Sequence, residues 1–211
     1  MRVSLPGIER PEGPVQILFV CTGNICRSPL AEALLRHEID HLPVVVSSAG
    51  THALEGHLMT EQNQTIARAQ GVLDTHRHSA RQLNADIVRS ADLVLALDRE
   101  HRRRIVNLVP RSSRYAFTLR EFSRLTVSYL EQSAREFQEV ATAAELRNAI
   151  RRVAELRGTL PLLDDPNEDD VVDPYLKEDV VYEQSAGQLI PAVSNVVKLL
   201  CTSDPMKGSG L

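Results

Sequence analysis

The stretch ILFVCTGNICRSPLAEALL, residues 17–35, decides the fold. Its first four residues, 17–20, form a short apolar run that is typical of a buried strand. Helix signals begin at Ser28, a favoured N-cap residue, which is followed by Pro29 at the first helical position. The stretch therefore predicts a strand, a loop over residues 21–27, and a helix.

Strand-like and helix-like segments alternate along the rest of the chain. Further strands are predicted at 43–47, 93–97 and 115–118, and helices at 60–69, from Asp98 to near Pro110, and at 180–200. Alternation of this kind is typical of βαβ units around a parallel sheet. The sequence thus predicts an α/β fold with a four-stranded parallel sheet flanked by helices, and ligands in such sheets collect at the carboxyl ends of strands, where Cys21 lies.

The predicted domain organisation is simple. Residues 1–16 contain three prolines and are expected to form a flexible arm, and residues 202–211 a flexible tail. Residues 17–201 form one domain. Within it, about 128–170 form a helical insertion that would cover the active-site mouth, bind a partner or, as we expect, simply extend the surface.

Composition excludes several classes of protein. The chain has 211 residues, a formal net charge of −4 and three cysteines. The charge gives no reason to expect nucleic-acid or membrane binding, and no apolar run is long enough to span a bilayer. The first residues lack the apolar core of a signal peptide, and an odd, small number of cysteines does not suit a disulfide framework. We therefore expect a cytoplasmic protein, whose oligomeric state the sequence leaves open.

The loop carries the chemistry. Cys21 and Arg27 are separated by five residues. The loop amides, the helix N-terminus, the Arg27 charge and the Ser28 hydroxyl would each favour the thiolate of Cys21, which is the nucleophilic form. Arg27 offers a planar fork that matches two phosphate oxygens, while Gly23 and Asn24 permit unusual backbone geometry. Together these residues favour nucleophilic attack on phosphorus over an inert buried cysteine.

The stretch VCTGNICRSPLAE resembles the signature of the low-molecular-weight protein tyrosine phosphatases. Four further segments match this family in the family's order: 47–51, 78–82, 93–98 and 173–175. The likeness runs from about residue 17 to 200 with one interruption. It implies the phosphatase fold with an added helical insertion, and a phosphotyrosine protein as substrate.

The resemblance also implies roles for particular residues. Cys21 would form a phosphocysteine, and Asp173 would protonate the leaving phenolate and then activate water. Arg27 would hold the phosphoryl oxygens together with the phosphate-binding residues Thr22, Gly23, Asn24, Ile25, Cys26, Ser28 and Tyr175. Asn24, Ser48 and His78 would form a buried network that supports the loop. No metal or other cofactor is implied, and no metal-ligand spacing is present.

Asp173 has a rival as the general acid. Asp165 also precedes a proline, and it lies in a more acidic segment that would raise a carboxyl pKa by like-charge repulsion. Only Asp173 is followed by an aromatic residue, Tyr175, which would stack against a phenyl ring. We favour Asp173.

Three alternative functions remain. Related protein arginine phosphatases carry threonine where this chain has Ile25, which argues for an aryl phosphate. Thiol-dependent arsenate reductases need extra cysteines in the region that is here 71–98, which has none. A non-catalytic phosphotyrosine-binding relative would not need Cys21, Arg27 and Asp173 together.

Cys26 would either pack in the loop or form a reversible disulfide with Cys21.

Overall fold

The computed structural model describes residues 13–132, 136–137 and 142–203. Its main sheet has four parallel strands in the order β2-β1-β3-β4: β1 (Val15–Cys21), β2 (Val44–Gly50), β3 (Leu93–Ala96) and β4 (Ala116–Thr118). The predicted four-stranded parallel sheet is confirmed. A small antiparallel pair joins β5 (Glu136–Phe137) to β6 (Thr202–Ser203).

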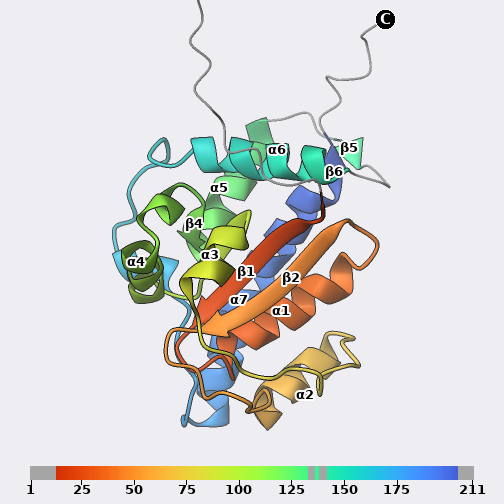
Figure 1. Cartoon of the computed structure of the whole chain (residues 1–211), viewed down its shortest axis with the longest axis vertical. Helices are drawn as coiled ribbons and strands as arrows, with labels where there is room; N and C mark the ends of the chain where they lie inside the picture. The colour runs from red at the N-terminus through yellow and green to blue at the C-terminus, as the bar shows by residue number, and fades with distance from the viewer. Residues whose placement is uncertain (1–12, 133–135, 138–141, 204–211) are drawn as a thin grey trace, which may run out of the picture.

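Helices pack on both faces of this sheet (Figure 1). They are α1 (Arg27–Glu38), α2 (Glu61–Ala69), α3 (Ala85–Ser90), α4 (Arg99–Leu108), α5 (Leu119–Gln132), α6 (Ala143–Glu155) and α7 (Asp179–Leu200), with short 3₁₀ turns η1 (Pro110–Arg114) and η2 (Pro166–Asp169). Side chains of α1, α5 and α7 share one hydrophobic cluster with the sheet, and those of α3 and α4 share the other. Within the described residues, no helix combines the length and apolarity that a bilayer crossing requires.

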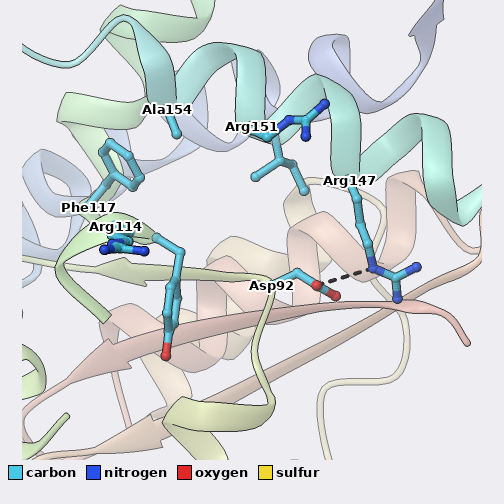
Figure 2. Close-up of a pocket in the computed structure, with 8 residues that line it drawn as sticks. Asp92, Arg114, Phe117, Arg147, Arg151 and Ala154 are labelled. Carbon is cyan, nitrogen blue, oxygen red and sulfur yellow. Dashed lines mark hydrogen bonds and ion pairs between the residues drawn. The ribbon is translucent and has the colours of Figure 1, made fainter. Parts of the chain in front are cut away.

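The predicted insertion contains one well-packed helix, α6. A capping box of Thr142 and Glu145 starts it, and its buried residues join the main core: Leu146, Ala149, Ile150 and Val153. Arg147 forms an ion pair with Asp92, just before β3, at 3.2 Å (Figure 2). The helix therefore lies at the amino ends of the strands, away from the mouth of the site at their carboxyl ends (Figure 1).

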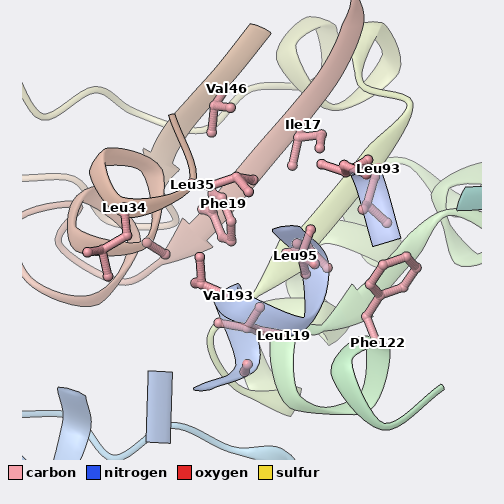
Figure 3. Close-up of a cluster of buried hydrophobic side chains, with 14 of the residues drawn as sticks. Ile17, Phe19, Leu34, Leu35, Val46, Leu93, Leu95, Leu119, Phe122 and Val193 are labelled. Atoms are coloured by element: carbon pink, nitrogen blue, oxygen red, sulfur yellow. The ribbon is translucent and has the colours of Figure 1, made fainter. Parts of the chain in front are cut away.

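Strand β1 lies at the centre of the molecule and is buried on both faces. Ile17 and Phe19 point into the larger cluster, where Leu35 of α1, Leu95 of β3 and Val193 of α7 also lie (Figure 3). The alternate residues of β1, Leu18 and Val20, belong to the cluster on the opposite face. Because side chains alternate along a strand, a run of apolar residues without polar interruptions is what a central parallel strand requires.

The structure differs from the sequence-based expectation at several boundaries. Strand β1 begins at Val15, so two residues of the predicted arm belong to the sheet, and residues 1–12 and 204–211 lie outside the described residues. Helix α1 begins at Arg27, and its N-cap position is Cys26 rather than Ser28. Helix α5 begins at Leu119, before the expected insertion, and α7 continues through Pro191. Helix α3 was not predicted.

Candidate active site

The segment that follows β2 holds the loop between β1 and α1 in place through backbone hydrogen bonds. Backbone N–H groups of Thr51, His52 and Leu54 donate to the carbonyl oxygens of Cys21, Thr22 and Gly23, at 2.9, 3.0 and 3.0 Å. These bonds fix the carbonyl side of the loop to the protein. Two elements that follow neighbouring strands of the sheet thus set the loop's shape together.

Asn24 is the residue on which the loop turns. Its φ of 56° lies in the left-handed region, which asparagine tolerates better than most residues. Its side-chain amide donates to Ser28 Oγ at 2.9 Å and to Ser48 Oγ at 2.8 Å, and its Oδ1 accepts from the Arg81 N–H at 2.9 Å. Every polar group of this fully buried side chain is therefore satisfied, so the side chain stabilises an otherwise unfavourable backbone conformation.

A second layer of polar residues supports Asn24. His78 Nε2 donates to the Asn24 carbonyl oxygen at 2.6 Å, and Ser48 Oγ donates to Glu32 Oε2 at 2.6 Å. His78 Nδ1 lies 4.0 Å from the same Glu32 oxygen. Burial lowers the pKa of His78 and outweighs the opposite effects of the Asn24 carbonyl and the Glu32 charge, so the neutral ring is favoured.

Cys21 is 2% exposed, and its sulfur lies at the floor of the loop. It receives the backbone N–H of Asn24 at 3.3 Å and contacts Ser28 Oγ at 2.9 Å. Because Ser28 Oγ already accepts from the Asn24 amide, its own hydrogen can point to the sulfur. Two donors and the N-terminus of α1 therefore surround a group that reacts as an anion.

Arg27 spans the site from the first turn of α1, and it is 3% exposed. Its Nη1 donates to the Val171 carbonyl oxygen at 3.0 Å and to Asp98 Oδ2 at 3.2 Å, while Nη2 lies 2.8 Å from Asp173 Oδ2. Its Nε is buried and has no hydrogen-bond partner among the residues that the structure describes. The guanidinium is thus fixed on one side and keeps a donor that an anion would satisfy.

Asp98 ties Arg27 to the start of the loop. It is the N-cap of α4 and accepts the His101 N–H at 2.7 Å, and its Oδ1 lies 2.9 Å from His101 Nδ1. His101 Nε2 in turn lies 2.8 Å from Thr22 Oγ1. Burial raises the pKa of Asp98, but His101 and Arg27 lower it further, to about 2. The carboxylate is therefore charged at neutral pH and holds both partners in place.

A cavity of about 240 Å³ opens above the sulfur. It is lined by Cys21, Thr22, Gly23, Ile25, Cys26, Arg27, His52, Leu54, Asp173 and Tyr175. The Tyr175 ring is partly exposed at the rim, and its backbone N–H donates to Asp173 Oδ1 at 3.2 Å. The next residue, Leu176, has a φ of 58°, an uncommon conformation for leucine that marks the turn carrying Tyr175 over the cavity.

The two candidate acids occupy different places. Asp173 lines the cavity and pairs with Arg27. Asp165 is the N-cap of η2, where its Oδ1 accepts from both the backbone and the side chain of Asn167. It is not among the residues lining this cavity.

Cys26 differs from Cys21 in its surroundings. It packs with Ile25, Ala80 and Tyr182, and burial raises the pKa of its thiol to about 11, with the Thr60 hydroxyl acting in the opposite direction. Both thiols are free in this structure. Cys26 is therefore protonated at neutral pH, and whether it forms a disulfide with Cys21 stays a prediction.

The structure brings together all the residues that the sequence singled out in and around the loop: Cys21, Thr22, Gly23, Asn24, Ile25, Cys26, Arg27, Ser28, Ser48, His78, Asp173 and Tyr175. Further contributors were missed or given no role at the site: Glu32, Arg81, Asp98, His101 and the cavity-lining His52 and Leu54. One signal was available, since Glu32 lies four residues after Ser28 on the same helix face.

Comparison with known proteins decides the family. Residues 16–155 match the model of the low molecular weight phosphotyrosine protein phosphatase family, which is more than half of the chain. This chain belongs to that family. The predicted family, fold and class of activity, that of a cysteine-dependent protein phosphatase, are thereby confirmed.

The names of relatives in this family refer to two different substrates, phosphoarginine and phosphotyrosine in proteins. A protein-arginine-phosphatase of Geobacillus stearothermophilus is 39% identical over 145 residues, which are 67% of this chain and 95% of that protein. The low molecular weight protein-tyrosine-phosphatase Etp of Escherichia coli K12 is 42% identical over 94 residues, 44% of this chain and 62% of the relative. The YwlE arginine phosphatase structure from Geobacillus stearothermophilus matches with a TM-score of 0.61 at 26% identity, covering 88% of this chain and 92% of that one.

Proposed function

We propose that this protein hydrolyses phosphotyrosine in a protein substrate through a phosphocysteine intermediate. The Cys21 sulfur attacks phosphorus, the bond from phosphorus to the phenolic oxygen breaks, and Asp173 gives its proton to that oxygen. Water, deprotonated by Asp173, then attacks the phosphocysteine and releases inorganic phosphate. Arg27 and the loop amides hold the non-bridging oxygens in both steps.

One observation carries this proposal: Cys21, Arg27 and Asp173 line a single cavity, with Tyr175 at its rim. The sulfur has two donors, and the carboxylate is next to the guanidinium, whose buried Nε has no hydrogen-bond partner in the described part of the chain. These are the positions that a nucleophile, an anion holder and a proton donor need around one phosphoryl group. A ring at the rim suits an aryl ester, because two aromatic rings stack favourably.

The side chain of Ile25 supports tyrosine over arginine as the phosphorylated residue. It lines the cavity close to Gly23 and Leu54, so this part of the wall is apolar. An apolar wall favours a phenyl ring, whereas a guanidinium would lose hydrogen bonds to water there without replacement. We therefore expect Ile25→Thr to raise activity on phosphoarginine relative to phosphotyrosine, and an unchanged ratio would remove this part of the argument.

The decisive experiment is turnover of p-nitrophenyl phosphate and of a phosphotyrosine peptide, with Cys21→Ser as the matched inactive variant. We expect the natural chain to release phosphate from both substrates and Cys21→Ser to release none. Binding of the peptide without phosphate release would indicate a non-catalytic phosphotyrosine-binding protein instead. A thioredoxin-coupled arsenate assay tests the reductase alternative, which predicts thiol-dependent arsenite formation.

We also infer that the protein acts in a reducing compartment such as the cytoplasm. The proposed reaction needs Cys21 as a free thiolate, and both loop cysteines are free.

A further inference from the structure

A second pocket lies at the opposite edge of the sheet from Cys21. Its volume is about 260 Å³, and it is lined by Asp92, Arg114, Tyr115, Phe117, Arg147, Ile150, Arg151 and Ala154. Asp92 precedes β3 and Tyr115 precedes β4, so the pocket is at the amino ends of strands whose carboxyl ends face the phosphate loop. Figure 2 shows the pocket enclosed between α6 and this edge of the sheet.

Helix α6 forms one wall with a single face. Its four lining residues, Arg147, Ile150, Arg151 and Ala154, follow the spacing i, i+3, i+4 and i+7, which places them on one stripe of a helix. Because α6 belongs to the insertion, this pocket exists only where that helix is present. The insertion therefore creates a concave surface besides extending the outer one.

The pocket combines an apolar interior with excess positive charge. The apolar surface comes from Phe117, Ile150, Ala154 and the Tyr115 ring. The charged lining residues are three arginines and one aspartate. Figure 2 places Arg114 beside Phe117 on one side and Arg147 on the other, with Arg151 between them on the helix.

The single carboxylate in the pocket is already neutralised. Asp92 pairs with Arg147 at 3.2 Å and also accepts the backbone N–H of Gln16 at 2.9 Å. Arg147 is further held by the carbonyl oxygens of Gly13 and Pro14, at 2.9 and 3.1 Å. This pair therefore forms a fixed part of the wall, and among the described residues no carboxylate pairs with the other two arginines.

Arg114 and Arg151 supply that uncompensated charge. Arg151 Nη2 donates to a neutral partner, Asn148 Oδ1, at 2.7 Å. The Arg114 side chain makes no hydrogen bond or ion pair with any residue that the structure describes. A guanidinium group on either wall of an apolar pocket matches an anionic group attached to an apolar body.

We propose that this pocket binds a small organic anion, an aromatic ring that carries a carboxylate or a phosphate. The ring lies against Phe117, Ile150 and Ala154, and the anionic group meets the guanidinium of either Arg114 or Arg151, which belong to different walls of the pocket. The volume accommodates about one substituted ring, so the dissociation constant for a simple compound is on the order of 1 mM. The site is separate from the phosphatase centre and does not depend on the proposed reaction.

The test uses 4-(trifluoromethyl)benzoate as the probe, because it is not a phosphate ester and its ¹⁹F NMR signal reports binding directly. The pocket variant is Arg114→Glu/Arg151→Glu. The matched control is Arg111→Glu/Arg152→Glu, which changes exposed arginines on the same two elements that do not line the pocket. Arg27→Met tests whether the probe binds instead at the phosphate loop, and circular dichroism checks that each variant is folded.

We expect saturable binding to the natural chain, weakened about tenfold or more in the pocket variant and changed less than about twofold in the control and in Arg27→Met. The uncharged analogue 4-(trifluoromethyl)benzyl alcohol is expected to bind about tenfold more weakly than the benzoate. Absence of saturable binding up to about 10 mM would overturn the proposal. Equal losses in the pocket and control variants, loss in Arg27→Met, or equal affinity for the alcohol would also overturn it.

Discussion

Asp173 and Arg27 form an ion pair in which Oδ2 lies 2.8 Å from Nη2, although the two residues are 146 positions apart in sequence. The arginine side chain is almost fully buried, and the aspartate side chain is about half exposed. In this structure the carboxylate therefore takes the place of an anion beside the guanidinium. A phosphoryl group that binds to Arg27 would compete with it, and would free Asp173 to face the leaving oxygen.

The first prediction separates the two candidate acids. Asp173→Asn removes a proton donor from the cavity, and we expect turnover of phenyl phosphate, which has a poor leaving group, to fall about 10²-fold to 10³-fold. Asp165→Asn changes only a cap of η2, so its rate should stay within about twofold of the natural chain. Both rates are measured by phosphate release. Loss of turnover in Asp165→Asn alone would make Asp165 the acid.

The second prediction concerns the close approach beneath the loop. A Cβ on Gly50 would clash with the Thr22 carbonyl oxygen and lie 3.0 Å from Ala53 Cα, both of which are backbone atoms that cannot easily move. We expect Gly50→Ala to lower the free energy of unfolding by about 2–4 kcal/mol and Tm by about 5–10 °C. The matched change Gly23→Ala meets its nearest neighbour, Ile25 Cγ1, at an ordinary 3.4 Å, and should cost less than about 1 kcal/mol. Similar melting temperatures for the two variants would contradict this account.

The third prediction uses the low pKa of Asp98. Its pKa in the folded protein is about 2, against an ordinary 3.8, so the folded state favours the charged form. The stability that follows, about 2 kcal/mol, is complete above about pH 4 and is lost as the pH falls through 2. Asp98→Asn keeps an N-cap side chain but loses the charge, and should remove that amount of stability at pH 7. Urea unfolding at several pH values measures both effects. Between pH 4 and pH 2 the free energy of unfolding should fall more for the natural chain than for Asp98→Asn. If the two free energies fall in parallel with pH, Asp98 does not cause the loss of stability.

The fourth prediction distinguishes the two loop cysteines. With a pKa of about 11, Cys26 is a thiolate in only about one molecule in 10⁴ at pH 7. Iodoacetamide should therefore label Cys21 at neutral pH and leave Cys26 unlabelled, in a Cys201→Ser background that removes the third thiol. Peptide mass spectrometry reads the sites, with Cys21→Ser as the control. For the same reason a peroxide-induced disulfide between Cys21 and Cys26 should form faster as the pH rises, and faster labelling of Cys26 than of Cys21 would refute the assignment.

The central strand and the loop were predictable because their signals are local. An apolar run, a glycine, an asparagine and an arginine before Ser-Pro all lie within residues 17–29. Ser28 shows the limit of such signals, because its hydroxyl contacts Cys21 and Asn24 instead of capping α1. A side chain near a helix start can serve either purpose, and only the fold determines which.

Contacts between distant segments required either the family resemblance or the structure. Ser48 and His78 were assigned to the loop's support through the resemblance alone. His101 was missed because its partner Thr22 is 79 residues away, and no periodic pattern connects them. Helix α3 is only six residues long and has one buried side chain, so it gave no periodic signal.

The direction of the parallel strands also determines where a label can be attached without blocking the catalytic mouth. The described chain enters the sheet at Val15 and ends at Ser203 in β6, both on the side of the molecule where α6 lies (Figure 1). The catalytic mouth opens at the other end of the same strands. A label attached near Val15 or Ser203 would therefore lie at the end of the sheet opposite the mouth, and would leave that mouth open to a large phosphorylated target.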